Sequence, residues 1–100
     1  MKIYRTAKSI RLYRGESQYN KGGKYWTTDK EWAMQFTQSG LPSQVKSIIL
    51  PDERIFRDNP VPSAVNAEEL DKTEERALSE GFDAFWVNEG VGQPESVYMM

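Results

Sequence analysis

Apolar residues that recur every three or four positions predict two helices in this sequence. The first begins after an N-cap at Thr28 or Asp29 and stops at Gly40, because glycine commonly follows the last turn of a helix. Glu31 lies in its first turn, where the helix dipole favours an acid. Its buried face is expected to hold Trp32, Ala33 and Phe36.

The second helix is predicted over residues 67–80. Asn66 directly precedes it and can accept hydrogen bonds from the free N–H groups of the first turn. Gly81 follows the last turn and gives the chain a residue that tolerates the left-handed conformation. The stripe that faces the core is expected to hold Leu70, Ala77 and Leu78.

Short runs of β-branched and aromatic residues, several with alternating polarity, predict strands. These are residues 2–5, 9–14, 24–27, 44–50, 82–87 and 95–100. Gly15 is expected to end the second of them, before a polar loop at residues 16–23. Apolar residues occupy both faces of residues 44–50, which predicts a strand covered on both sides. The last two strands form a hairpin that is connected through residues 88–92.

The order of these elements is β-β-β-α-β-α-β-β, which predicts an α+β fold. We expect a small, mostly antiparallel sheet, strongly bent or split, with two helices. A chain of 100 residues is the size of one domain, so residues 1–100 are assigned to a single domain.

Composition excludes several kinds of chemistry. The chain has no cysteine and no histidine, which removes thiolate nucleophiles, serine–histidine–aspartate triads and imidazole metal ligands, and we expect no metal site. Its net charge of −2 makes general nucleic-acid binding an unfavoured function. It has no apolar run of membrane-spanning length and no signal-peptide pattern, so we expect a cytoplasmic protein without a membrane partner.

Arg14 is the first residue with a candidate role. By strand alternation it lies on the same face as Ile10 and Leu12, so its guanidinium ends an apolar stripe. An arginine at a sheet rim can bind a phosphate through two parallel hydrogen bonds. Gly15 beside it allows backbone or ligand to come close. The alternative is a surface arginine before a turn.

Thr27 and Thr28 form the second candidate site, between the strand that holds Trp26 and the first helix. Their hydroxyl groups can orient a neighbouring carboxylate or a ligand, and the helix N-terminus adds positive potential. The alternative is plain N-capping by Thr28 or Asp29, which does not exclude a function.

Gln93 and Glu95 form the third candidate site, on one face with Val97 and Met99. A carboxylate that ends an apolar stripe can stabilise a cation-like sugar centre and bind a ribose hydroxyl. The alternative is a solvated glutamate at the start of an edge strand.

In this order, the three sites resemble the mono-ADP-ribosyltransferase superfamily, in particular its Arg-Ser-Glu branch with its bacterial toxins and phage enzymes. The resemblance runs from Tyr-Arg-Gly, through Trp-Thr-Thr and its helix, to Gln-Pro-Glu and the closing hairpin, over about residues 10–100. It implies an ADP-ribosyltransferase-like fold and an enzyme that transfers ADP-ribose from NAD to a macromolecular acceptor, with release of nicotinamide.

The resemblance also implies the roles of single residues. Arg14 and Gly15 would contact the phosphates or the nicotinamide ribose of NAD. Thr27, and Thr28 beside it, would brace the catalytic acid Glu95, which would bind the 2′-hydroxyl of that ribose. Two further residues have implied roles. Gln93 would face a protein acceptor, and Tyr25 or Trp26 would stack on nicotinamide or belong to the core.

Several features depart from the family pattern. Arg5 competes with Arg14 for the arginine role, and Pro94 stiffens the Gln-x-Glu segment. The chain is also shorter than most family members. Two other functions therefore stay open: a small non-catalytic binding protein on the same fold, such as a phage inhibitor of a host factor, and a toxin-like fragment that needs a targeting partner. The binding protein predicts an exposed apolar patch that includes Trp86 or residues 99–100.

Overall fold

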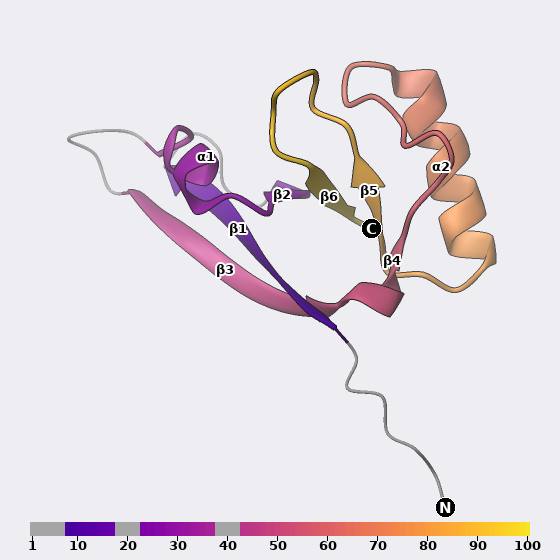
Figure 1. Cartoon of the computed structure of the whole chain (residues 1–100), viewed down its shortest axis with the longest axis horizontal. Coiled ribbons are helices and arrows are strands. Elements are labelled where there is room, and N and C mark those ends of the chain that lie inside the picture. Colours follow the sequence, from indigo (N-terminus) through magenta and orange to yellow (C-terminus); the bar gives the residue numbers. More distant parts are fainter. Residues whose placement is uncertain (1–7, 18–22, 38–42) are drawn as a thin grey trace, which may run out of the picture.

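A computed structural model describes residues 8–17, 23–37 and 43–100 of the chain. Its elements, in chain order, are β1 (Ser9–Ser17), β2 (Tyr25–Thr27), α1 (Lys30–Met34), β3 (Ser43–Pro51), the short 3-10 helix η1 (Asp52–Arg54), β4 (Ile55–Phe56), α2 (Ala67–Ser79), β5 (Ala84–Val87) and β6 (Ser96–Met99) (Figure 1). The strand expected at residues 2–5, with Arg5, lies outside the described residues, as does Gly40.

The strands form one six-stranded sheet in the order β3-β1-β2-β6-β5-β4. Only the pair β4–β5 is parallel among the strand pairs of the described ranges, so the predicted α+β class with a mostly antiparallel sheet is confirmed. Leu12 of β1 and Ile55 of β4 belong to one buried cluster, although three strands separate β1 from β4 in the sheet. The sheet therefore curls into a half-barrel (Figure 1).

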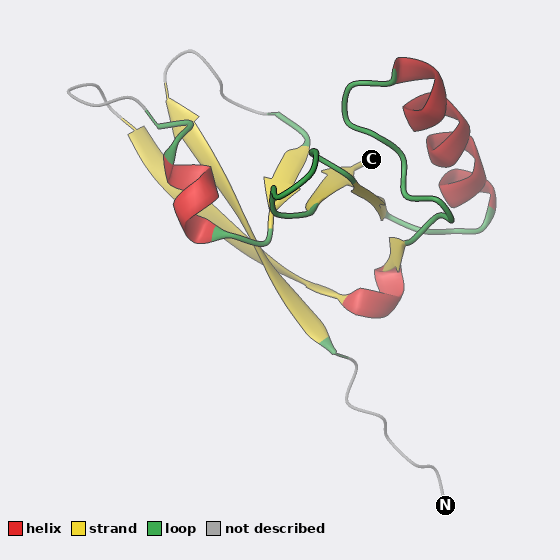
Figure 2. Cartoon of the chain, turned by 45° about the horizontal axis from the view of Figure 1, so that its top comes forward, coloured by secondary structure: helices red, strands yellow, loops and turns green. Residues whose placement is uncertain are grey.

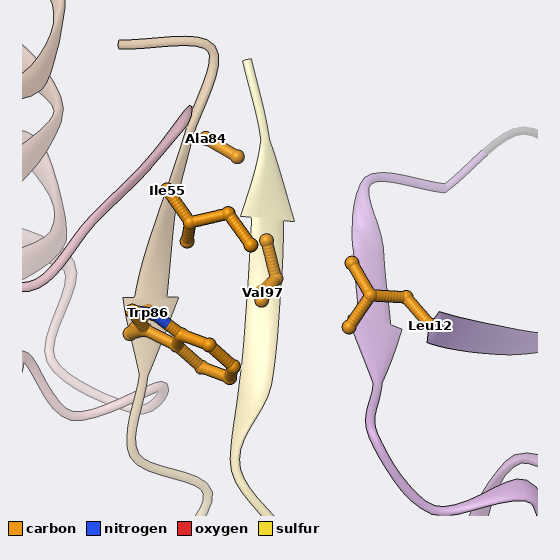
Figure 3. Close-up of a cluster of buried hydrophobic side chains, with 5 residues drawn as sticks. All are labelled: Leu12, Ile55, Ala84, Trp86 and Val97. Carbon is orange, nitrogen blue, oxygen red and sulfur yellow. The ribbon is translucent and has the colours of Figure 1, made fainter. Parts of the chain in front are cut away.

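The concave face of the half-barrel encloses the larger core. Its buried members are Leu12, Ile55, Ala84, Trp86 and Val97 (Figure 3). Ile48 and Leu50 of β3 pack against this cluster. Ile49, which points to the other face, is 53% exposed, so the prediction of a strand covered on both sides is wrong there. Helix α1 covers this face of the sheet only near Gly15. Ile49 pairs with Arg11, toward the other end of β1, so α1 does not cover it.

The convex face carries α2, which packs on Phe85 and Val87 of β5 through Ala77. The predicted N-cap is confirmed, because Asn66 Oδ1 accepts a hydrogen bond from the Glu69 N–H at 3.1 Å. Leu78 was expected in the buried stripe but is 57% exposed. Thr73 occupies the stripe instead and is 2% exposed, because its hydroxyl donates to the buried Asp58.

Helix α1 is shorter than predicted. Asp29 is its N-cap, as one of the two predicted alternatives, and Asp29 Oδ1 accepts from the N–H groups of Glu31 and Trp32. The helix ends at Met34, before the expected stop at Gly40. The next N–H groups bond carbonyls three residues back, which tightens the winding and ends the α-helix. Phe36 therefore follows the helix and is 48% exposed.

Strand β1 is longer than predicted and does not end at Gly15. It runs to Ser17 and pairs with β3 in continuous antiparallel register from Ser9 to Ser17. At the other end of the chain, the predicted hairpin is confirmed: β5 and β6 pair antiparallel, with Trp86 opposite Val97.

Candidate functional site

A pocket opens on the convex face of the sheet, between α1 and the connection that follows β5. Its cavity volume is about 50 Å³. Five of the residues predicted from the sequence line it: Arg14, Gly15, Tyr25, Trp26 and Thr27. The view in Figure 2 shows how α1 lies beside the sheet. The structure therefore gathers Arg14, Gly15 and Thr27 around one pocket, whereas Thr28 of the second candidate site lines the neighbouring hollow.

Gly15 sets how close α1 comes to the sheet. A Cβ atom on Gly15 would lie 1.8 Å from the carbonyl oxygen of Ala33 and 3.3 Å from Cβ of Phe36. No side chain fits in that space, so only glycine lets the backbone of α1 rest on β1. The prediction that Gly15 allows a close backbone approach is thus confirmed. Gly15 and Ala33 of α1, which meet here, both line the pocket.

The floor of the pocket is a row of residues across three neighbouring strands. Tyr13 of β1 pairs with Thr27 of β2, and Thr27 pairs with Ser96 of β6. Paired residues in a sheet point to the same face, so these three side chains share the convex face. Thr27 is 5% exposed and Ser96 is 1% exposed. Segments that are far apart in the sequence meet here because β6 returns beside β2.

Among the described residues that line the pocket, one is acidic: Glu89, in the connection between β5 and β6. The hydroxyl of Ser96 donates to Glu89 Oε2 at 2.6 Å. Tyr25 lies on the same wall, and burial raises the pKa of its hydroxyl, with smaller contributions from Tyr98 and from the charge of Glu89. The pocket is therefore partly desolvated and carries one acid.

Arg14 is held by the protein itself. Its Nε lies 3.0 Å from Glu16 Oε2, and its Nη1 donates to the carbonyl oxygen of Tyr25 at 3.1 Å. Lys46 Nζ lies 2.8 Å from the other oxygen of Glu16. The side chains of Arg14 and Glu16 are 14% and 7% exposed. A phosphate at Arg14 would have to share the guanidinium with Glu16.

The threonine pair and the predicted acid lie side by side. The backbone N–H of Thr28 donates to the carbonyl oxygen of Glu95, and the hydroxyl of Thr28 approaches the same oxygen, both at 3.4 Å. Thr27 does not make this contact, and its Oγ1 instead accepts a hydrogen bond from the Asp29 N–H at 3.2 Å. Of the two threonines, Thr28 is the one that contacts the Glu95 segment.

The carboxylate of Glu95 forms a two-pronged ion pair with Arg57, at 2.9 Å and 3.1 Å. The guanidinium of Arg57 lies over the ring of Trp86, 4.7 Å from its centre. The hydrogen bonds from Arg57 hold the pKa of Glu95 below its ordinary value, although partial burial acts in the opposite direction. The side chain of Glu95 is 47% exposed, so this is a rim ion pair and not a core one.

Strand alternation separates Glu95 from the pocket. Ser96 points to the convex face, so the preceding Glu95 points to the concave side, where it meets Arg57 above Trp86. A shallow hollow beside the pocket is lined by Tyr13, Thr28 and Pro94, and it marks the rim between the two faces. Gln93 is exposed in the connection before β6.

The aromatic candidates divide between the two cores. Trp26 packs against the concave cluster, and Tyr25 packs against the convex one, in edge contact with Tyr98. Both residues also line the pocket. Trp86, which the binding-protein alternative expected in an exposed patch, is 5% exposed, and that expectation is wrong because Trp86 belongs to the concave core.

Six of the residues that line the pocket were not predicted as site residues, and Glu89 and Trp32 are two of them. Glu89 lies in a segment that reads as a plain hairpin connection, and Trp32 was assigned to the buried face of a helix. The available signal for Glu89 was an acid placed directly between two apolar strands. For Trp32 it was an indole N–H, which needs an acceptor when it is buried.

Comparisons with protein-family models, curated proteins and solved structures give no match to this chain. Within the described residues, no group of acids is arranged to hold a metal ion. In the same ranges, no helix has the length and apolar character that crossing a membrane requires. The functional argument therefore depends on the geometry of the chain itself.

Proposed function

We propose that this chain binds NAD across the rim between the pocket and Glu95 and transfers ADP-ribose to a protein acceptor. One observation carries the proposal: Thr28 bonds the main chain of Glu95, so the second and third candidate sites are adjacent. Arg14 lies on the next strand, β1, which pairs with β2. The three motifs on which the resemblance depends thus lie on or directly beside the neighbouring strands β1, β2 and β6, although the sequence separates them widely.

The proposed chemistry needs a carboxylate near the ribose carbon that bears nicotinamide. When the bond between this carbon and the nicotinamide nitrogen breaks, the ribose becomes cation-like and nicotinamide leaves as a neutral ring. A carboxylate stabilises that charge, and a nucleophile of the acceptor then bonds to the carbon and loses its proton to solvent. Arg57 keeps Glu95 ionised, as this role requires, and must give up part of its ion pair when the ribose arrives.

The test is nicotinamide release from NAD, with and without a mixture of acceptor proteins, followed by chromatography. We expect the substitution Glu95→Gln to slow release by about a hundredfold or more, because it removes the charge that stabilises the transition state. Glu75→Gln, at an exposed position on α2, is the matched control and should leave the rate unchanged. A wild-type chain that releases no nicotinamide, or a Glu95→Gln variant as active as the control, would contradict the proposal.

A further inference from the structure

One side of the sheet ends in a long, regular strand edge. β3 (Ser43–Pro51) has nine residues and is the last strand on its side, so β1 pairs with one of its edges and no described strand pairs with the other (Figure 1). The pairing with β1 is continuous. Such an edge offers N–H and C=O groups to a further strand, and proteins commonly shorten, bend or cover it. β4, at the opposite edge, has only two residues. The edge of β3 is therefore the place where this sheet can be extended.

The hydrogen bonds to β1 show which groups of β3 face outward. The Asp52 N–H donates to the carbonyl oxygen of Lys8 at 2.7 Å, so these two residues form a hydrogen-bonded pair directly beyond β3. In an antiparallel strand, every second residue bonds the same neighbour. The odd-numbered residues therefore direct their N–H and C=O groups outward: Ser43, Val45, Ser47 and Ile49. From residue 45 on, their side chains lie on the convex face, because Ile48 packs into the concave core.

This edge is complementary to a second copy of itself. A two-fold axis through Ser47 sets two β3 strands antiparallel, with Ser47 opposite Ser47. Val45 then faces Ile49 of the second copy on the convex face, and the same pair recurs on the other side of the axis. Cross-strand pairs of β-branched side chains stabilise a sheet. Ser47 Oγ accepts from Arg11 at 3.4 Å and keeps a proton that it can donate across the axis.

The same operation covers an apolar side chain that one copy leaves exposed. Ile49 is 53% exposed because α1 lies over the other end of β1, at Gly15. Gly15 pairs with Val45, and α1 also approaches β3. The two-fold axis brings Ile49 of the second copy beside Val45, which is the end that α1 covers. Phe36, which is 48% exposed and follows α1, lies close to Gly15 at this end. Each copy thus supplies the cover that the other lacks.

The charge on this edge does not oppose the contact. Lysine on an edge strand commonly prevents edge-to-edge pairing, because its ammonium group has to stay in water. Lys46 Nζ instead lies 2.8 Å from Glu16 Oε1, on the neighbouring strand β1. Its charge is thus neutralised and directed away from the outer edge of β3. In the register centred on Ser47, Lys46 faces Ile48 of the second copy, which the aliphatic stem of the lysine can contact.

We infer that β3 is the interface of a homodimer, in which two copies join their sheets through antiparallel β3 strands with Ser47 opposite Ser47. A two-fold contact of this kind is closed, because it uses the β3 edge of both copies and leaves only the short β4 edges. The dimer does not depend on the transferase chemistry, because β3 holds none of the three motifs. Association and nicotinamide release can therefore fail independently.

The first experiment measures the mass of the chain by sedimentation, at concentrations from about 1 μM to about 1 mM. We expect the mass to rise toward twice that of one chain. Ile49→Lys places a charge opposite Val45 and should weaken association by at least about tenfold. Leu78→Lys, with the same change of charge at an exposed position of α2, is the matched control and should associate as the wild type does.

A second experiment tests the register by disulfide cross-linking. The chain has no cysteine, so one introduced cysteine can form a disulfide only between two copies. In the proposed register, the two Ser47 Cα atoms lie about 5.5 Å apart, which a disulfide spans. The two Ile49 positions lie about 13 Å apart along the strands, beyond the reach of a disulfide. Under mild oxidation, Ser47→Cys should therefore give a covalent dimer, and Ile49→Cys should not.

Three results would overturn the proposed interface. A wild type that stays monomeric at about 1 mM would exclude the dimer and leave the edge for an extended segment of another protein. Association that Ile49→Lys leaves unchanged would place the contact on another surface. Cross-linking of Ile49→Cys as complete as that of Ser47→Cys would refute the register.

Discussion

The substitution Gly15→Ala tests how α1 is held on the sheet. The new Cβ atom would lie 1.8 Å from the carbonyl oxygen of Ala33 and 2.9 Å from its carbonyl carbon. Ordinary contacts between such atoms are about 3.5 Å, so one backbone must move by roughly 1.5 Å. Both nearest atoms belong to the backbone, and no change of side-chain rotamer relieves the overlap. β1 is paired along its whole length with β3, so α1 is the element that moves.

We expect the free energy of unfolding of Gly15→Ala to fall by about 1–3 kcal/mol, the usual cost of overpacking. For a domain of this size, the melting temperature then falls by roughly 4–8 °C for each kcal/mol. Helix α1 has five residues and cannot persist away from the sheet, so the pocket should lose that wall. Urea denaturation measures the stability, and the amide signals of residues 30–34 report the position of α1.

Gly81→Ala is the comparison variant. Gly81 has φ +85° and open space around its Cβ position, so alanine there costs about 1–2 kcal/mol through backbone strain alone. Both variants should lose stability, but only Gly15→Ala should shift the signals of α1 and weaken ligand binding in the pocket. The reasoning fails if Gly15→Ala is as stable as the wild type with α1 signals unchanged.

Two further substitutions test side-chain interactions away from α1. Thr73→Val keeps the shape of the side chain but removes the 2.6 Å hydrogen bond to the buried Asp58. Urea denaturation should show that the free energy of unfolding falls by about 1–3 kcal/mol. A change within about 0.5 kcal/mol would contradict a stabilising role of this hydrogen bond. Arg57→Gln removes the hydrogen bonds that lower the pKa of Glu95, so carboxyl NMR should find that pKa higher than in the wild type. Because the folded pKa is lowered, the ion pair stabilises the wild type above the pKa of unfolded glutamate and loses this effect as the pH falls through the folded pKa. The difference in the free energy of unfolding between the wild type and Arg57→Gln, at most about 1 kcal/mol for a rim pair, should therefore vanish in acid. A difference that persists in acid would show that the pKa of Glu95 is not lowered by folding.

The features that the sequence predicted well are local ones. The caps Asp29 and Asn66 depend on a side chain and the N–H groups two or three residues ahead. The hairpin of β5 and β6 depends on two neighbouring apolar runs. Each of these is decided within a few residues, so residue type and spacing are sufficient evidence.

The features that the sequence missed depend on distant partners. Thr73 replaces Leu78 in the buried stripe because Asp58, from the loop after β4, supplies an acceptor under α2. The ion pair between Glu95 and Arg57 was not predicted, because no periodic pattern connects the two residues. Such pairings follow from the order of strands in the sheet, and that order is not readable from spacing alone.

Strand alternation at the start of β6 gives the chain two carboxylates in different surroundings. Ser96 holds Glu89 on the convex face, and the residue before it, Glu95, turns to the concave side. Under the proposed function, NAD that contacts the pocket reaches Glu95 only across the rim near Thr28. Substitutions of the two acids should then have different effects. Glu89→Gln should weaken the binding of NAD, whereas Glu95→Gln should leave that binding intact and slow the cleavage of NAD. If both variants instead weaken the binding of NAD equally, the two faces act as one site, and the separation by alternation is wrong.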